Sequence, residues 1–282
     1  MENGTKKRFS VSTILMLVLF IIMAAFTLLP FYSILLSSFR PGTELMRHGL
    51  GLQIDLPLMS LNNYFLLFSD ETPYFTWFLN SFKITVVQTT LTLLVTAFVG
   101  YGFAMYDFRF KNIAFTCVLF VMMIPVEIIM LPLYKMCISM GLMDTMWGII
   151  LPTLAMPMPI FFFRQYLSGI PRDFLDAARI DGCTEYGTFF RIILPLMKPS
   201  FASMGIFVGM TSWNSYLWPM LVIRSGDKIT LPLGLASLIT PYGNNYDVLI
   251  AGSVFSIIPI VILFLFFQKY FIAGMTAGGV KG

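Results

Sequence analysis

The chain has 282 residues, of which 57% are hydrophobic and only 11% charged, and its formal net charge is +4. Soluble domains carry about 25% charged residues, and even a chain of roughly 300 residues leaves about a quarter of its unfolded surface exposed, so a soluble globular enzyme is excluded. The 29 Phe residues exclude a disordered chain, and three scattered cysteines form no disulfide framework: Cys117, Cys137 and Cys183. We conclude that this is an integral membrane protein.

Six segments are nearly free of charged residues, and each is long enough to span a bilayer as a helix, which takes about 18–20 apolar residues. They are 9–39, 84–106, 112–134, 145–163, 199–223 and 248–268. Membrane-spanning strands are shorter and alternate polar with apolar residues, which these segments do not. The sequence therefore predicts an all-α, multi-pass membrane protein with a six-transmembrane-helix domain over residues 12–272.

Proline residues predict breaks in the third and fourth of these segments. The third holds Pro125 and Pro132, and the fourth holds Pro152, Pro157 and Pro159. Proline inside a helix removes a backbone hydrogen bond and kinks or breaks the helix. In a bilayer the freed carbonyl groups must face protein or a water-filled path. This pattern favours a transport bundle over a simple membrane anchor.

The distribution of basic residues predicts the orientation. With the N-terminus inside, twelve basic residues are cytoplasmic: Lys6, Lys7, Arg8, Arg109, Lys111, Arg164, Arg172, Arg179, Arg191, Lys198, Lys269 and Lys281. Six are outside or near the outer ends: Arg40, Arg47, Lys83, Lys135, Arg224 and Lys228. This split obeys the positive-inside rule, so we expect cytoplasmic tails at 1–11 and 273–282. The positive net charge reflects topology and does not indicate a nucleic-acid partner.

A few polar or aromatic residues within or beside the spans are candidates to line a path for a solute. They are Asn80, Glu127, Trp213, Asn214 and Ser215. A carboxylate inside a membrane is a functional candidate because its burial costs at least a few kcal/mol, and an indole ring can stack on a sugar. The alternatives are that Glu127 braces a proline kink and that tryptophans anchor at the interface, which we expect for Trp218.

The inner segment 164–199 predicts a pair of short helices joined by a tight turn. Asp173, after Pro171, is a candidate cap for the first helix, and Gly182 stands where that helix should end, because glycine adopts the left-handed cap conformation easily. Thr184 can cap the second helix, and Pro195 is expected to end it. A small rigid element of this kind suits docking into a groove on another protein.

The spacing within this segment resembles the EAA motif of ATP-binding-cassette (ABC) import permeases, written E-A-A-x3-G-x9-I-x-L-P. The matching residues are Asp176, Ala177, Ala178, Gly182, Ile192, Leu194 and Pro195. The one departure is Asp176 in place of Glu, which keeps the carboxylate but shortens its reach by one methylene. In that family this helix pair couples the permease to the ATPase subunit, and the resemblance implies the same role for these seven residues.

Other segments are similar to the carbohydrate-uptake branch of these importers, and to its MalG-like subunits in particular. They are the W-N-S-Y-L-W-P stretch at 213–219 and the G-M-T-A-G-G-V-K-G ending at 274–282. The resemblance implies a permease that translocates a sugar or oligosaccharide in the cell (inner) membrane of a bacterial-type cell. Its implied partners are a second homologous permease, an ATPase dimer, an extracytoplasmic solute-binding protein and membrane lipid.

The sequence holds no G-x-x-x-x-G-K-[ST] phosphate loop, so we expect no cofactor on this chain, with ATP and Mg used by the partner ATPase. His48 is the only histidine, and neither a clustered metal site nor a catalytic constellation is predicted. Two alternatives stay open: the same importer architecture carrying a polyol or sugar phosphate, and a secondary transporter working alone, which is disfavoured because no repeated halves are visible.

Overall fold

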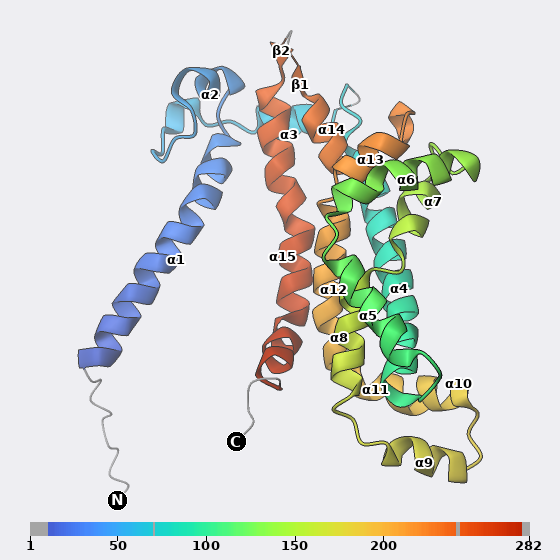
Figure 1. Cartoon of the computed structure of the whole chain (residues 1–282). Coiled ribbons are helices and arrows are strands. Elements are labelled where there is room, and N and C mark those ends of the chain that lie inside the picture. Colours follow the sequence, from blue (N-terminus) through green and yellow to red (C-terminus); the bar gives the residue numbers. More distant parts are fainter. Residues whose placement is uncertain (1–10, 70, 241–242, 278–282) are drawn as a thin grey trace, which may run out of the picture. The chain divides into compact units, whose positions relative to one another are not determined.

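The computed structural model describes residues 11–69, 71–240 and 243–277, and this part of the chain is almost entirely helical (Figure 1). Residues 1–10 of the first predicted tail and 278–282 of the second, which include the end of the terminal motif, lie outside the described residues. The chain divides into two compact units: Met1–Thr72 with Leu238–Phe255, and Pro73–Ser237 with Ser256–Gly282.

The first unit contains a long apolar helix and a set of short elements near its end. The elements are α1 (Val11–Ser37), α2 (Gly42–His48), η1 (Leu56–Leu58), α3 (Asn62–Leu67), the antiparallel pair β1 (Ile239–Thr240) and β2 (Gly243–Asn244), and the beginning of α15 (Tyr246–Ala277). Most side chains of α1 are exposed, as suits a helix surrounded by lipid. The Asn63 amide donates to the carbonyl oxygens of Ser38 (2.9 Å) and Arg40 (2.7 Å), which secures the chain after α1.

The second unit is a helical bundle built around α4. Its elements are α4 (Tyr74–Met105), α5 (Lys111–Met122), α6 (Val126–Ser139), α7 (Met146–Ile150), η2 (Leu151–Thr153), α8 (Pro157–Leu167), α9 (Asp173–Ile180), α10 (Glu185–Thr188), η3 (Phe189–Ile193), α11 (Leu194–Leu196), α12 (Lys198–Trp213), α13 (Leu217–Val222), η4 (Gly226–Lys228), α14 (Leu231–Ser237) and the rest of α15.

Within this unit α4 packs mainly against α8 and α12. A small residue brings α4 and α8 close together: a methyl group built at Gly100 would lie 2.8 Å from Cβ of Phe163 and 2.9 Å from the backbone nitrogen of Arg164. Such close approach of helix backbones is what small residues permit in membrane bundles. The buried side chains around this contact include Ala97, Tyr101, Phe163, Leu167 and Phe189.

The predicted spans appear partly as straight helices and partly as bent pairs. In the described residues α1, α4 and the part of α15 up to Gln268 are each long and apolar enough to cross a membrane. Three pairs reach that length only when a bend is included: α5 with α6 (104°), α7 and η2 with α8 (46°), and Glu185–Leu196 with α12 (80°). Counting each pair as one span gives up to six spans by length and composition. The last pair differs from the predicted segment 199–223, because it includes Glu185–Leu196 of the inner segment.

The bends follow the prolines only in part. The break between α5 and α6 falls at Pro125, as expected, because proline has no N–H and restricts the residue before it. Pro132 lies inside α6 without ending it. The segment 112–134 is therefore not one straight helix, and the charge-free segment 199–223 is divided between α12 and α13 at Asn214–Tyr216.

Candidate coupling helices and path residues

The inner segment forms the predicted pair of short helices, α9 and α10, at one end of the second unit (Figure 1). Gly182 has φ +76°, in the left-handed region that favours glycine, and so ends α9 as expected. The Thr184 side chain accepts a hydrogen bond from the Gly187 amide at 3.1 Å, so the predicted cap of α10 is confirmed. The predicted cap at Asp173 is wrong, because Asp173 is already the first helical residue and Arg172 precedes it without a side-chain cap.

α9 has one face on the bundle and one exposed face. Leu175 and Ala178 are buried, at 2% and 1% exposure, and Leu175 lies in the core cluster beside α4. Phe174 and Ile180 are exposed, at 43% and 86%. The carboxylate-bearing Asp176 and its neighbour Ala177 are exposed as well. A helix fixed on one side with apolar and charged groups on the other has the form of a docking element.

Two sets of ion pairs connect this helix to the rest of its unit. At its start, Arg172 contacts Asp107 at 2.9 Å, and Lys111 contacts the same carboxylate at 3.1 Å. Hydrogen bonds from Arg172 and Lys111 hold the pKa of Asp107 below its ordinary value. These contacts join α9 to the α4–α5 loop at its first turn.

The second set lies at the end of α9. Arg179 contacts Glu185 at 3.0 Å and Asp176 at 3.7 Å. The Tyr106 hydroxyl, just after α4, also donates to Glu185. No motif in the sequence marks Tyr106, Arg179 or Glu185 as functional. Arg179 occupies an unspecified position of the EAA-like motif, and no local pattern pairs Tyr106 with Glu185. The set joins both short helices to the end of α4.

The second helix continues beyond the point where proline was expected to end it. Pro195 lies in α11, after the π-helical turn η3, in which the Leu194 amide donates to the Phe189 carbonyl five residues back. The wider turn accommodates both the proline ring and the absence of a proline N–H. The chain then bends by 80° into α12. Of the remaining motif residues, Ile192 and Leu194 are half-buried and Pro195 is exposed.

The candidate path residues fall into two groups. Three have a side-chain donor occupied within this unit: the Asn80 amide donates to the carbonyl oxygens of Asp227 (2.8 Å) and Ile229 (3.0 Å), the Asn214 amide to the Met210 carbonyl (2.9 Å), and the Trp213 indole to the Ser256 carbonyl (3.1 Å). Trp213 is 5% exposed. In the second group, Glu127 is exposed and Ser215 is half-buried.

Trp218 is not an interfacial anchor, contrary to prediction. Its side chain is 7% exposed, and its indole N–H donates to the Gly148 carbonyl at 3.2 Å. The ring lies in a buried cluster with Ile149 and Val222. Hydrophobicity alone did not distinguish the two environments, because an indole suits both an interface and a packed site with one acceptor.

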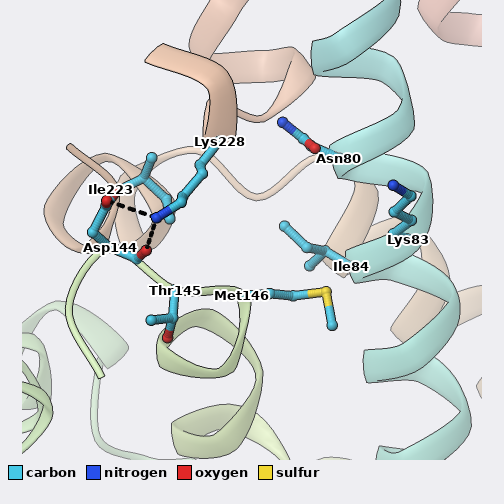
Figure 2. Close-up of a pocket in the computed structure, with 8 residues that line it drawn as sticks. All are labelled: Asn80, Lys83, Ile84, Asp144, Thr145, Met146, Ile223 and Lys228. Carbon is cyan, nitrogen blue, oxygen red and sulfur yellow. Dashed lines mark hydrogen bonds and ion pairs between the residues drawn. The ribbon is translucent and has the colours of Figure 1, made fainter. Parts of the chain in front are cut away.

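A cavity of about 330 Å³ opens beside Asn80, at the other end of the bundle from α9. Figure 2 shows Asn80, Lys83 and Ile84 projecting from α4 on one side, with Lys228 directed at Asp144 on the other. The Lys228 ammonium donates to the Asp144 carbonyl and carboxylate, each at 2.9 Å. Hydrogen bonds from Ser225, from the Arg224 and Ser225 amides and from Lys228 hold the pKa of Asp144 far below its ordinary value. This carboxylate therefore joins the loops before α7 and after α13.

Comparison with known proteins identifies the family. Residues 93–277 match the family model of the binding-protein-dependent transport system inner membrane component. The chain belongs to this family. As a permease of a binding-protein-dependent ABC importer, it is an inner-membrane subunit that acts with an ATPase and a binding protein and is not itself the ATPase. The permease is of the carbohydrate-uptake branch that the sequence indicated, a family with no cofactor of its own.

Individual relatives cover nearly the whole chain. The permease is 52% identical over 275 residues to the arabinooligosaccharides transport system permease protein AraQ of Bacillus subtilis (strain 168), covering 98% of each chain. It is 36% identical to the lactose transport system permease protein LacG of Rhizobium radiobacter over 75% of this chain and 76% of that protein. Its fold matches a chain in the crystal structure of a bacterial ABC transporter involved in the import of the acidic polysaccharide alginate. That match has TM-score 0.81 and 24% identity, covering 94% of this chain and 100% of the other.

Proposed function

We propose that this permease imports arabinooligosaccharides. The supporting observation is the full-length similarity to two proteins named for that transport, at 52% identity to the B. subtilis protein and 54% to that of Halalkalibacterium halodurans, against 36% to the lactose permease. The test is growth and uptake in a strain lacking the gene. Loss of arabinooligosaccharide uptake that the intact gene restores is expected. If uptake of these sugars stayed normal and uptake of a polyol or a sugar phosphate were lost, that compound would be the substrate instead.

The exposed face of α9 is proposed to carry the motion of the ATPase into the bundle. The residues proposed to act in this coupling to the ATPase are those of the motif: Asp176, Ala177, Ala178, Gly182, Ile192, Leu194 and Pro195. It is supported by the opposite environments of Leu175, which is buried, and Ile180, which is exposed. The test places a cysteine at Ile180 and single cysteines at successive positions on the ATPase surface. We expect at least one of the ATPase positions to form a crosslink with residue 180. Failure of every ATPase position to crosslink, in a complex that still transports, would refute this docking face.

The working complex is proposed to contain a second homologous permease and an ATPase dimer. Both termini of this chain are proposed to be cytoplasmic, with tails at 1–11 and 273–282. The membrane domain is proposed to cover residues 12–272. The split of basic residues supports this orientation. Purification of a tagged chain from its host, followed by mass spectrometry, tests the composition. Recovery of a single permease type would contradict the heteromeric arrangement.

The solute path is proposed to pass Glu127, Asn214 and Ser215, with Asn80 and Trp213 shaping its wall. Accessibility supports the first three, since Glu127 and Asn214 are exposed, Ser215 is half-buried, and their carboxylate, amide and hydroxyl oxygens can accept hydrogen bonds from sugar hydroxyls. Glu127→Gln keeps the shape of the side chain and removes the charge. A raised half-saturation concentration for uptake is expected, with unchanged amounts of assembled complex. Unaltered uptake would support the alternative in which Glu127 braces the break at Pro125.

A further inference from the structure

A cavity of about 510 Å³ lies beside the first turn of α5, at the end of the bundle that also carries α9. Its wall is formed by the loop between α4 and α5, by the first residues of α5 and by Arg164 of α8. None of the proposed coupling or path residues lines it, so it is a separate feature of the permease.

Arg164 brings an uncompensated positive charge to this cavity. Its guanidinium carbon lies 3.9 Å from the centre of the Phe115 ring, and its buried Nε has no hydrogen-bond partner within the described chain. The one carboxylate in the lining, Asp107, is already paired with Lys111 and Arg172. A partly buried guanidinium without an acceptor is costly, because desolvation is not repaid by a hydrogen bond.

Three of the lining residues are apolar and exposed. Phe108, Phe110 and Ile113 are exposed, at 48%, 61% and 63%. Cations beside exposed apolar side chains, at the end of a membrane helix, match a molecule with an anionic head and hydrocarbon chains. A phosphate group offers the planar fork of arginine two oxygen acceptors.

We propose that this cavity binds a phosphate group through Arg164 and Lys111, and that the group is the phosphodiester of an anionic membrane phospholipid. The exposed side chains of Phe108 and Phe110 favour the lipid over free phosphate, since inorganic phosphate would gain nothing from them. The Lys111 ammonium donates to the Tyr106 carbonyl and to Asp107, which leaves its third N–H for the ligand.

The test uses the complete importer in nanodiscs that contain equal parts of phosphatidylglycerol and digalactosyldiacylglycerol, a neutral bilayer lipid that has no phosphate. Native mass spectrometry after release counts the lipids that stay bound. The intact complex should retain phosphatidylglycerol in roughly tenfold preference, the factor expected of one charge-assisted hydrogen bond. Arg164→Gln should abolish the preference. Arg109→Gln removes an equal charge from the neighbouring loop but not from the cavity lining, and should keep it.

Three results would overturn the proposal. The first is an intact complex that shows no preference for phosphatidylglycerol. This result does not depend on the folding of any variant, and it would mean that another subunit covers Arg164. The second is equal retention in Arg164→Gln and the intact complex, and the third is equal loss in Arg109→Gln. A second arm adds inorganic phosphate to complexes in digalactosyldiacylglycerol alone. Thermal stabilisation there that depends on Arg164 would assign the site to free phosphate and refute the lipid.

Discussion

Gly182 offers a direct test of whether the turn between α9 and α10 is needed for transport. Its backbone lies in the left-handed region, with φ +76°, and a methyl group built on it would have no atom of a non-neighbouring residue within 4 Å. A substitution here therefore changes the backbone preference without causing a clash. The perturbation is the series Gly182→Asn, Gly182→Ala and Gly182→Val.

The magnitude follows from the backbone conformation. An alanine in the left-handed region costs about 1–2 kcal/mol, whereas asparagine adopts that region more readily. Such a cost changes an equilibrium by a factor of roughly 5–30. A β-branched residue is a stronger outlier there. We expect coupling to fall in the order Gly, Asn, Ala, Val, with asparagine close to the native residue.

The assay is the importer reconstituted in liposomes with its binding protein. Binding-protein-stimulated ATP hydrolysis and solute uptake are measured together, and copurification of the ATPase is measured separately. The expected result for Gly182→Val is normal insertion with weakened ATPase attachment and uptake. Two results would refute the reasoning: full uptake by Gly182→Val, or a defect in Gly182→Asn as large as that of Gly182→Val.

Three further predictions concern the same unit. Thr184→Ala removes the side-chain cap of α10 and should lower stability by about 1 kcal/mol, seen in thermal unfolding of the detergent-solubilised complex; Thr184→Ser should keep it. Arg179→Glu and Glu185→Arg should each reduce uptake by breaking the contact at the end of α9. The double variant should recover, and failure to recover would show that the pair itself is not required. Gly100→Leu should destabilise the bundle by about 1–3 kcal/mol or more, because its side chain would enter the contact with Phe163. Unchanged thermal unfolding would show that α4 and α8 separate easily.

The sequence predicted those features that depend on neighbours along the chain. The turn at Gly182 and the cap at Thr184 each involve residues within one helical turn, so the residue types and their spacing are sufficient. The break at Pro125 is local for the same reason. The apolar segments also predicted the helical class, because a bilayer requires internally satisfied backbone hydrogen bonds.

Features that depend on distant partners were not predictable. Trp218 is equally suited to an interface and to a buried site, and only the presence of the Gly148 carbonyl decides between them. Tyr106 and Glu185 meet across 79 positions of sequence, which no spacing rule connects. The environments of the candidate path residues were not predictable for the same reason, since Asn80 and Trp213 donate hydrogen bonds to carbonyl groups that a single sequence does not place.

The amino-acid sequence alone determined that this protein is a multi-pass helical membrane protein with a short helix pair, because length, hydropathy and local turn chemistry act over a few residues. The tertiary structure alone decided which side of α9 is exposed, how sharply α5 and α6 diverge, and that the buried Nε of Arg164 has no acceptor among the described residues. These outcomes depend on which helices pack together, and packing energy is a property of the assembled bundle and not of any one segment.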